Sequence, residues 1–269
     1  MFLVNGVASD HVSISNRSFQ YGDGCFSTIL VREGKPQLWD FHRQRMSACL
    51  KVLRIDEPEW TQVLTWIEQL AQSMTLGGIK VHVCRGAGSR GYGIDGAGET
   101  QVTVNDFAYP NHYQRWQQVG VALGVSRVKL GHQPILAGHK HNNRLEQVLI
   151  KADAQDQGEL DTVVLDIDER VIETSIANLF WVNAQGQVCT PDLRSCGVAG
   201  VMRRQVLTLL KQMGVEVKVD HFMLGDLMQA KTVWMTNSLM EIVPISSIDG
   251  YRFAIDAITR QLQEKLSTC

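Results

Sequence analysis

The alternation of hydrophobic and polar positions divides the first half of the chain into short strands and two amphipathic helices. The predicted strands are bounded by Gly or Pro and cover residues 2–4, 12–14, 25–31, 36–39, 79–84 and 101–108. Asn5-Gly6 is a turn sequence, but the first two strands lie too far apart for a tight hairpin. Glu33-Gly34 predicts a hairpin turn. A helix capped by Asp40 and a second helix over residues 59–74 complete this half.

In the second half, strands and helices alternate. Apolar runs predict strands near 119–127, at 161–167, in the apolar part of 173–182 and over 233–236. Helical spacing predicts helices over 142–157, from the segment 197–204 to residue 213, and over 255–266. Tyr109-Pro110-Asn111-His112 interrupts the pattern and marks the expected domain boundary. We therefore predict a smaller N-terminal domain over residues 1–110, a linker over 111–118, and a larger C-terminal domain over 119–269.

One lysine stands directly before a predicted amphipathic helix. Lys140 is flanked by His139 and His141, and the apolar residues that follow at helical spacing are Leu145, Val148, Leu149 and Ala152. A lysine with titratable neighbours is suited to covalent chemistry on carbonyl compounds. A solvated lysine in a loop is the alternative, and the local sequence alone favours it.

Composition limits the classes of partner. The chain has 269 residues, of which 44% are hydrophobic and 20% charged, and its net charge of −2 gives no support for a nucleic-acid partner. No segment approaches the roughly 18 apolar residues of a transmembrane helix, and residues 1–10 lack the features of a signal peptide. We therefore predict a cytoplasmic protein with no membrane partner.

The cysteines and histidines do not have the spacing of a metal site. The six cysteines form no Cys-x-x-Cys pair, and the two-residue spacing of His139 and His141 fits neither a zinc-binding helix nor a finger. We predict reduced, mostly buried cysteines and no metal.

Two glycine-rich segments suggest ligand contacts. Gly86-x-Gly88-x-x-Gly91 follows a predicted strand, but the glycine-rich sequence after it cannot form the helix that dinucleotide binding requires. A flexible loop carrying Arg90 and Tyr92 toward a ligand is the preferred interpretation, with a plain hairpin loop as the alternative. The segment 197–204 leads into a helix whose first N–H groups suit a phosphate, although such helix starts are common.

Taken together, the spaced motifs resemble those of one family. They occur in the order Gly22-Asp23-Gly24-Cys25-Phe26, Phe41-His42-Arg43-Gln44-Arg45, Lys140-His141-Asn142-Asn143, Glu173-Thr174-Ser175-Ile176-Ala177-Asn178 and Gly197-Val198-Ala199-Gly200-Val201. This order resembles the fold-type IV pyridoxal-phosphate enzymes across essentially the whole chain. The resemblance implies a D-amino-acid aminotransferase-like α+β fold of two domains, with the cofactor in the interdomain cleft. It also implies a homodimer with shared active sites.

The resemblance implies roles for seven cofactor-binding residues. Lys140 would attach pyridoxal 5'-phosphate covalently and then act as the general base, and Glu173 would pair with the pyridine nitrogen. The phosphate would be held by Arg45, by the N–H groups of Val201 and Met202, and by the Ser238 hydroxyl. Asn178 would orient the groups around the cofactor.

Within the family, residues 142–149 and 88–92 most resemble the aminodeoxychorismate lyase branch. That branch forms 4-aminobenzoate and pyruvate on the way to folate by proton removal at C4 and elimination. Thr28 would guide the proton, or would simply face the core. The candidates for binding the substrate carboxylates are Arg90, Tyr92 and Asn237.

Two other functions remain open at the level of sequence. A branched-chain or D-amino-acid aminotransferase would use the same lysine, because fold does not determine reaction. A non-catalytic pyridoxal-phosphate-binding protein is the further alternative, but it would be expected to lack the lysine or the glutamate. His139 and Asn142 are more polar than is usual beside the family lysine.

Overall fold

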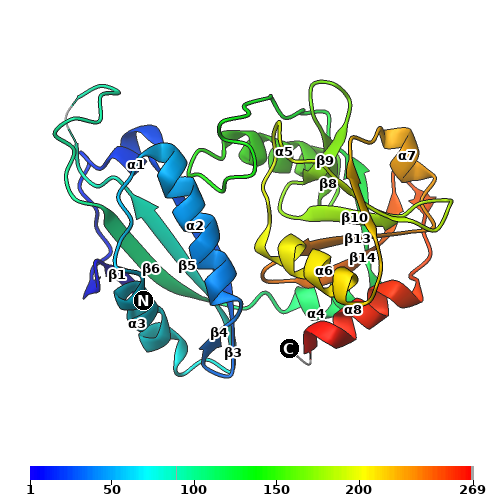
Figure 1. Ribbon diagram of the computed structural model, residues 1–269, viewed down its shortest axis with the longest axis horizontal. Coiled ribbons are helices and arrows are strands. Elements are labelled where there is room, and N and C mark those ends of the chain that lie inside the picture. The colour runs from blue at the N-terminus through cyan, green and yellow to red at the C-terminus, as the bar shows by residue number, and fades with distance from the viewer. Residues whose placement is uncertain (89, 268–269) are drawn as a thin grey trace. The chain divides into compact units, whose positions relative to one another are not determined.

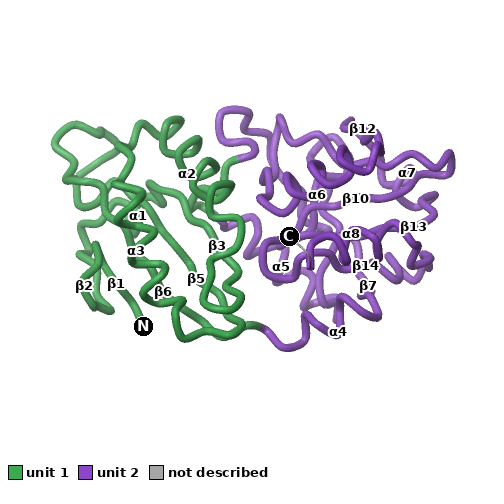
Figure 2. Tube along the Cα trace, turned by 60° about the horizontal axis from the view of Figure 1, so that its bottom comes forward, with its two compact units in different colours: residues 1–109, 139–143 green, residues 110–138, 144–269 purple. Residues whose placement is uncertain are grey.

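The computed structural model describes residues 1–88 and 90–267 of the chain (Figure 1). The described residues form two compact units (Figure 2). Unit 1 comprises Met1–Tyr109 and His139–Asn143, and unit 2 comprises Pro110–Gly138 and Arg144–Cys269. A short segment that contains Lys140 therefore belongs to unit 1, although the chain on either side of it belongs to unit 2.

Unit 1 is an antiparallel sheet covered by two helices. Its strands are β1 (Phe2–Val4), β2 (Val7–Ala8), β3 (Gly24–Arg32), β4 (Lys35–Pro36), β5 (Leu76–Cys84) and β6 (Gln101–Ala108), and its helices are α1 (Arg17–Tyr21), α2 (Trp39–Leu53) and α3 (Trp60–Ala71). The strand order is β2-β1-β6-β5-β3-β4. The core lies between one sheet face and the apolar sides of α2 and α3, and includes Ile29, Leu50, Ile67 and Ile79.

The first hairpin differs from the prediction. Val4 pairs with Val7 across a tight turn at Asn5-Gly6, so the second strand is at residues 7–8 and not at 12–14. Asn5 has φ 48° and Gly6 has φ 80°. Two consecutive positive φ values are those of the two-residue turn that Asn-Gly favours, so the prediction against a tight hairpin was wrong.

A partly buried carboxylate fixes the beginning of β3. Asp23 Oδ2 accepts hydrogen bonds from Arg17 Nε at 2.8 Å and from Arg85 Nε at 2.7 Å. Arg85 also donates to the carbonyl oxygens of Leu53 and Arg54 at the end of α2. Burial alone would raise the pKa of Asp23, but hydrogen bonds and charges from Arg85 and Arg17 lower it. The Gly22-Asp23-Gly24 motif thus anchors β3 to α1, β5 and α2.

Unit 2 is a sheet that closes on itself. Its strands are β7 (Val121–Val125), β8 (Thr162–Leu165), β9 (Val171–Thr174), β10 (Asn178–Val182), β11 (Val188–Pro191), β12 (Val217–Asp220), β13 (Thr232–Asn237), β14 (Glu241–Ile248) and β15 (Tyr251–Arg252). The order β12-β11-β10-β13-β14-β7-β8-β9 is closed by the pairing of β9 with β10 at Asn178 and Glu173. Five helices surround this barrel: α4 (His112–Val119), α5 (Leu145–Asp156), α6 (Val201–Gln212), α7 (Leu224–Met228) and α8 (Ala257–Ser267).

The interior of unit 2 is apolar and aromatic. Every residue of β8, β9, β10 and β11 is buried. Trp181 meets Phe222 edge to face with ring centroids 4.7 Å apart, and Phe180 stacks on Trp234 at 5.7 Å. Aromatic pairs at these separations add to the stabilisation that burial alone provides. Mixed helices and strands in two units agree with the predicted α+β class.

The predicted linker over residues 111–118 is a helix. In α4, Tyr113 and Trp116 recur at helical spacing and pack against the unit 2 core. The polar residues between them face outward, which gave the segment its linker-like composition. The structure therefore differs from the prediction here, because two large aromatic side chains are enough to attach a short helix.

The helix after Lys140 forms as predicted, but a different face is buried. The side chains buried in α5 are Ile150, Asp153 and Ala154. Asp153 is buried because its carboxylate accepts hydrogen bonds from the Arg127 backbone N–H at 2.8 Å and from Arg127 Nε at 2.6 Å. The side of the helix that was predicted to be apolar is exposed to solvent in the single chain. The exposed fractions of Leu145, Val148 and Leu149 are 77%, 60% and 58%.

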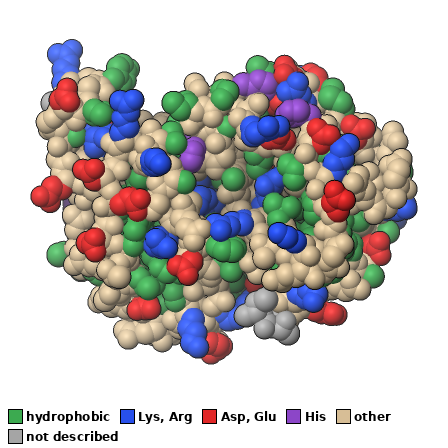
Figure 3. All heavy atoms as spheres, viewed as in Figure 1, with side chains coloured by type: hydrophobic (Ala, Val, Ile, Leu, Met, Phe, Trp, Pro, Cys, Tyr) green, Lys and Arg blue, Asp and Glu red, His purple; other side chains and the backbone are tan. Residues whose placement is uncertain are grey.

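The surface of the described residues carries both signs of charge, and Figure 3 shows acidic and basic side chains across one face. Among the helices of residues 1–88 and 90–267, none is both long and apolar enough to cross a membrane.

We predict that Asp23→Asn destabilises the fold by about 3–5 kcal/mol, because it leaves two buried guanidinium groups without their carboxylate. The pKa of Asp23 is lower in the folded chain than its ordinary value of 3.8. The ion pair therefore stabilises the fold above that value, and this contribution is lost as the pH falls through the folded-state pKa.

Urea unfolding at neutral and acid pH measures this difference. Asp40→Asn is the control, because Asp40 is an exposed partner of Arg43 and its loss should cost less than about 1 kcal/mol. Equal stability of the Asp23 variant and the parent at neutral pH would contradict the assignment.

Candidate active site

In unit 1, main-chain hydrogen bonds hold Lys140 against the beginning of β3. Phe26 N–H donates to the Lys140 carbonyl at 3.0 Å, and Asn142 N–H donates to the Gly24 carbonyl at 2.9 Å. These bonds give an isolated bridge between Cys25 and His141. Lys140 therefore lies in an extended segment beside β3, so its backbone position is set by the sheet.

The Lys140 side chain extends over an aromatic ring. Its Nζ lies 4.6 Å from the centroid of Phe26, and Nζ of Lys80 lies 4.9 Å from the same ring. His82 stacks on Phe26 at 5.3 Å. Thr28 lies two residues beyond Phe26 and so projects from the same face of the strand. This face therefore brings together an amine, an aromatic ring and a hydroxyl.

Asn142 and Asn143 fasten the lysine segment to unit 1. Asn142 Nδ2 donates to Ser18 Oγ at 2.8 Å, and Asn143 Nδ2 donates to the Gly22 carbonyl at 3.2 Å. Gly22 ends α1 with φ 65°, and a Cβ added there would overlap the Asn143 carboxamide. The polar character of Asn142 therefore serves a local hydrogen bond to α1.

Arg45 forms a second polar group in unit 1. Its Nη2 donates to Ser27 Oγ at 2.6 Å, and Ser27 Oγ lies 2.7 Å from His42 Nδ1. Nε of Arg45 is buried without a hydrogen-bond partner. Burial lowers the pKa of Arg45 to about 10 and, with the charges of Arg45 and Lys140, lowers that of His42. Arg45 is thus a cation at neutral pH with an unsatisfied donor, as an anion-binding residue requires.

In unit 2, Glu173 is buried and faces a turn. Glu173 Oε2 accepts hydrogen bonds from the Val198 backbone N–H at 3.0 Å and from Asn178 Nδ2 at 3.3 Å. Asn178 Nδ2 also donates to the Val198 carbonyl at 2.8 Å. A buried carboxylate requires hydrogen-bond donors. In the Glu-Thr-Ser-x-x-Asn pattern, the asparagine supplies one of these donors to the glutamate.

The same asparagine prepares the beginning of α6. Gly200 is the N-cap residue, and its N–H donates to Asn178 Oδ1 at 3.1 Å. Val201 and Met202 follow as the first helical residues, and N–H groups in this turn have no partner inside the helix. Gly200 has no room for a side chain, since a Cβ would overlap Asn178 Oδ1. Unit 2 thus presents a buried carboxylate and a helix N-terminus around one asparagine.

The proposed substrate loop in unit 1 is held through its backbone. Arg17 Nη1 donates to the Gly91 carbonyl at 3.0 Å, and the Tyr21 hydroxyl accepts from the Gly91 N–H at 3.1 Å. Arg90 is exposed, and Tyr92 is 86% exposed with its ring 5.4 Å from that of Tyr21. Ser89 and Cys269 lie outside the described residues. The sequence did not identify Arg17 or Tyr21 as the supports of this loop.

Ser238 and Asn237 lie at the turn between β13 and β14 in unit 2. Asn237 Oδ1 accepts from the Leu239 and Met240 N–H groups at 2.9 Å each, and its Nδ2 donates to the Ile176 carbonyl at 3.3 Å. Ser238 is half-buried. Local turn structure accounts for the Asn237 contacts, and its binding of substrate stays a prediction.

Sequence reasoning missed Ser27 and His42, which connect to Arg45. The alternation of β3 was a usable signal, because Ser27 is a polar residue on the face that otherwise packs against α2. His42 lies one turn before Arg45 on α2, with only 1% of its surface exposed. A buried histidine three residues from an arginine could have indicated this pair.

The fold and these residues define an enzyme of the amino-transferase type, and comparisons with known proteins agree. Residues 24–248 match the family described as amino-transferase class IV, so the chain belongs to that family. It is 48% identical to an aminodeoxychorismate lyase from Vibrio harveyi, with 100% of both chains covered.

Solved structures have the same fold. The 4-amino-4-deoxychorismate lyase from Pseudomonas aeruginosa superposes with a TM-score of 0.93 and 34% identity, covering 100% of this chain and 98% of that one. The Escherichia coli branched-chain amino acid aminotransferase has a TM-score of 0.87 at 21% identity, covering 99% and 93%. The fold-type IV resemblance is thereby confirmed.

We predict that Gly200→Ala lowers the stability of the chain by about 1–3 kcal/mol, because the new methyl group displaces the buried Asn178 carboxamide from its hydrogen bonds. Gly225→Ala is the matched control, since Gly225 lies in α7 with open space around it. Thermal unfolding of the two variants measures the difference, and equal melting temperatures would contradict this role for Gly200.

Proposed function

We propose that this chain is a pyridoxal-phosphate-dependent lyase that converts 4-amino-4-deoxychorismate into 4-aminobenzoate and pyruvate. The observation that carries the proposal is 48% identity to an aminodeoxychorismate lyase over the whole of both chains. The 34% identity to a solved lyase of the same name supports it. The reaction is proposed for the cytoplasm, as a step of folate biosynthesis.

The residues of both units fit pyridoxal 5'-phosphate. In unit 1, Lys140 would attach the cofactor, and the Arg45 guanidinium, whose Nε has no hydrogen-bond partner among the described residues, would bind its phosphate. In unit 2, the N–H groups of Val201 and Met202 would bind phosphate at the helix start, where anions are favoured, with the Ser238 hydroxyl.

Glu173 would hold the protonated pyridine nitrogen of the cofactor. Its Oε2 already accepts two hydrogen bonds, from Val198 and Asn178, so the carboxylate orientation is fixed before any ligand arrives. Asn178 contributes by connecting this carboxylate to the N-cap of α6. A preset ion pair needs little reorganisation when the cofactor binds.

Lys140 would perform the proton transfers. Pyridoxal phosphate, when bound, withdraws electrons from the substrate carbon that loses its proton. The Lys140 amine would remove the proton from C4, after which the bond to the neighbouring enolpyruvyl oxygen breaks and the ring becomes aromatic. The leaving enolpyruvate gains a proton at its methylene carbon to give pyruvate. Thr28, from the same strand face as Phe26, would guide the proton.

Arg90, Tyr92 and Asn237 are proposed to bind the substrate carboxylates. The Arg17 bonds to the Gly91 and Tyr92 carbonyls hold the loop backbone and leave the exposed Arg90 side chain to a dianionic ligand. A transaminase remains the second candidate, because an aminotransferase of the same fold would use Lys140 and Glu173 identically.

The protein is also proposed to be a homodimer. Leu145, Val148 and Leu149 lie within successive turns of α5 and are all more than half exposed. Adjacent apolar side chains of this size are unfavourable in water and suit contact with another apolar surface. A second copy of this chain offers the same surface, as a twofold interface requires.

We expect Lys140→Ala to abolish turnover and to lose the yellow, borohydride-sensitive absorbance of a covalently attached cofactor. Lys80→Ala is the matched control, because Nζ of both lysines lies over the Phe26 ring, and it should keep that absorbance. Absorbance spectra before and after borohydride, with release of 4-aminobenzoate and pyruvate, measure the two effects. Transamination of amino acids without 4-aminobenzoate release by the parent protein would instead support the aminotransferase.

We expect Leu149→Arg to convert the dimer into monomers, because a charge on the exposed apolar side of α5 opposes its burial against a second copy. Val219→Arg is the control, since Val219 is 49% exposed on β12, at one end of the strand order, whereas α5 packs against β8. Molar mass by light scattering reports the state of each variant. A parent protein that is monomeric at micromolar concentration would overturn the proposal.

A further inference from the structure

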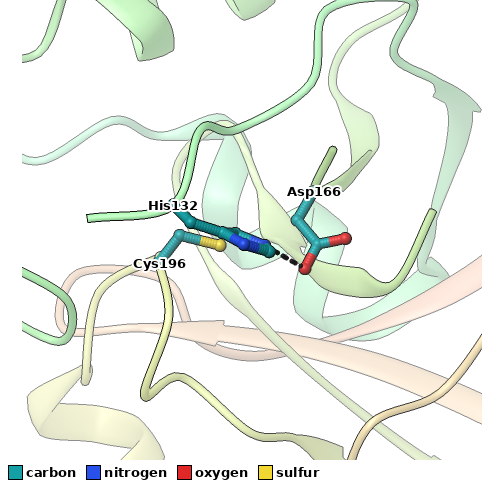
Figure 4. A group of neighbouring side chains, drawn as sticks. All are labelled: His132, Asp166 and Cys196. Atoms are coloured by element: carbon teal, nitrogen blue, oxygen red, sulfur yellow. Dashed lines mark hydrogen bonds and ion pairs between the residues drawn. The ribbon is translucent and has the colours of Figure 1, made fainter. Parts of the chain in front are cut away.

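A histidine, an aspartate and a cysteine meet in unit 2 outside the residues assigned to the cofactor. One donor atom from each of His132, Asp166 and Cys196 lies within 4.8 Å of the other two (Figure 4). His132 Nε2 is 2.8 Å from Asp166 Oδ2. In Figure 4 the Cys196 sulfur points toward the imidazole ring.

Main-chain contacts hold the three segments around this group. Leu130 forms a bridge with Asp166, and the Gln133 N–H donates to the Ser195 carbonyl at 3.0 Å. Each of these contacts lies within two residues of a member of the cluster. The backbone of unit 2 therefore holds the three residues close enough for their donor atoms to meet.

Asp166 is oriented as a ligand would be. Its Oδ1 accepts hydrogen bonds from the Asp168 and Arg170 N–H groups at 3.0 and 2.9 Å, which leaves Oδ2 directed at His132. Backbone support of this kind fixes a carboxylate ligand and tunes its metal. Asp166 is 1% exposed, so its charge is not dispersed by solvent.

The charge beside the thiol favours a cation. A carboxylate oxygen of Asp166 lies within 4.8 Å of the Cys196 sulfur, and a buried carboxylate at this distance stabilises a divalent cation bound between the two groups.

We propose that His132, Asp166 and Cys196 form a binding site for one Zn²⁺ ion, with water as the fourth ligand. Nitrogen, oxygen and sulfur donors are the set that zinc takes in proteins, at roughly 2.0–2.3 Å, which puts tetrahedral ligand atoms about 3.3–3.8 Å apart. The present separations, from 2.8 Å to at most 4.8 Å, bracket that range. The His132 side chain is 23% exposed and leaves a route for the ion.

The ion would join three segments near the proposed cofactor residues. Cys196 immediately precedes Gly197 and Val198, and the Val198 N–H donates to Glu173. Gly197 accepts a hydrogen bond from the Gly138 N–H, at the end of the segment that begins near His132. Zinc would therefore stabilise the turn before α6.

The test uses the full chain carrying Cys269→Ser, which removes the C-terminal thiol as a competing ligand. Metal-free protein is titrated with Zn²⁺ by calorimetry and with Co²⁺ by absorbance. We expect one ion per chain, a thiolate-to-cobalt charge-transfer band, the visible bands of tetrahedral Co²⁺, and a higher melting temperature with Zn²⁺.

Variants separate this site from other thiols and imidazoles. Cys196→Ser and His132→Gln should each weaken Zn²⁺ binding by at least about 100-fold, since even the loss of a ligand's supporting partner costs about 10–100-fold. Cys196→Ser should also remove the charge-transfer band. Cys189→Ser is the matched control, because Cys189 is buried elsewhere in unit 2, and it should bind like the parent.

Two results would overturn the proposal. One is the absence of stoichiometric Zn²⁺ binding by the folded parent. The other is unchanged binding in both Cys196→Ser and His132→Gln. His132 is the informative position if Cys196→Ser fails to fold, because its side chain is partly exposed. Neither result depends on lyase activity, so the zinc site and the proposed function can fail independently.

Discussion

The chemistry proposed for this chain depends on two main-chain hydrogen bonds, between Phe26 and Lys140 and between Gly24 and Asn142. They fix the lysine beside β3, where its amine lies over the Phe26 ring. The beginning of β3 is itself fixed by Asp23 between Arg17 and Arg85. The Asp23 carboxylate, which is paired with two buried guanidinium groups, thus determines where the Lys140 amine can be, although Asp23 and Lys140 are far apart in the sequence.

Unit 2 supports a buried carboxylate through amide groups. Glu173 Oε2 accepts hydrogen bonds from the Asn178 side chain and from the Val198 backbone N–H. These two donors fix the orientation of the carboxylate within unit 2. The same Asn178 occupies the space that a side chain at Gly200 would take. Asn178 therefore connects the Glu173 carboxylate with the backbone at the beginning of α6.

Sequence periodicity predicted most helices and strands of the fold, because apolar spacing reports burial directly. It was wrong about α5, where Leu145 and Leu149 are exposed and Asp153 is buried by its bonds to Arg127. Arg45, Lys140 and Glu173 were identifiable by their order along the chain. Ser27 and His42 were missed although the alternation of β3 and the spacing of α2 offered a signal for them. The His132–Asp166–Cys196 group was not identifiable, because contacts between distant segments create it. The spacing of residues 132, 166 and 196 contains no metal-site pattern.

The two parts of unit 1, residues 1–109 and 139–143, are separated in the sequence by residues 110–138 of unit 2, and this affects how the chain folds during its synthesis. Residues 1–109 leave the ribosome first and contain all six strands of the unit 1 sheet. The segment carrying Lys140 arrives only after residues 110–138, and it must then find the free edge of β3. Contacts between distant parts of a chain close large loops and form slowly. The unit 1 sheet of a newly made chain can therefore fold before the segment with Lys140 pairs with β3. Native-like structure then precedes catalytic competence during synthesis.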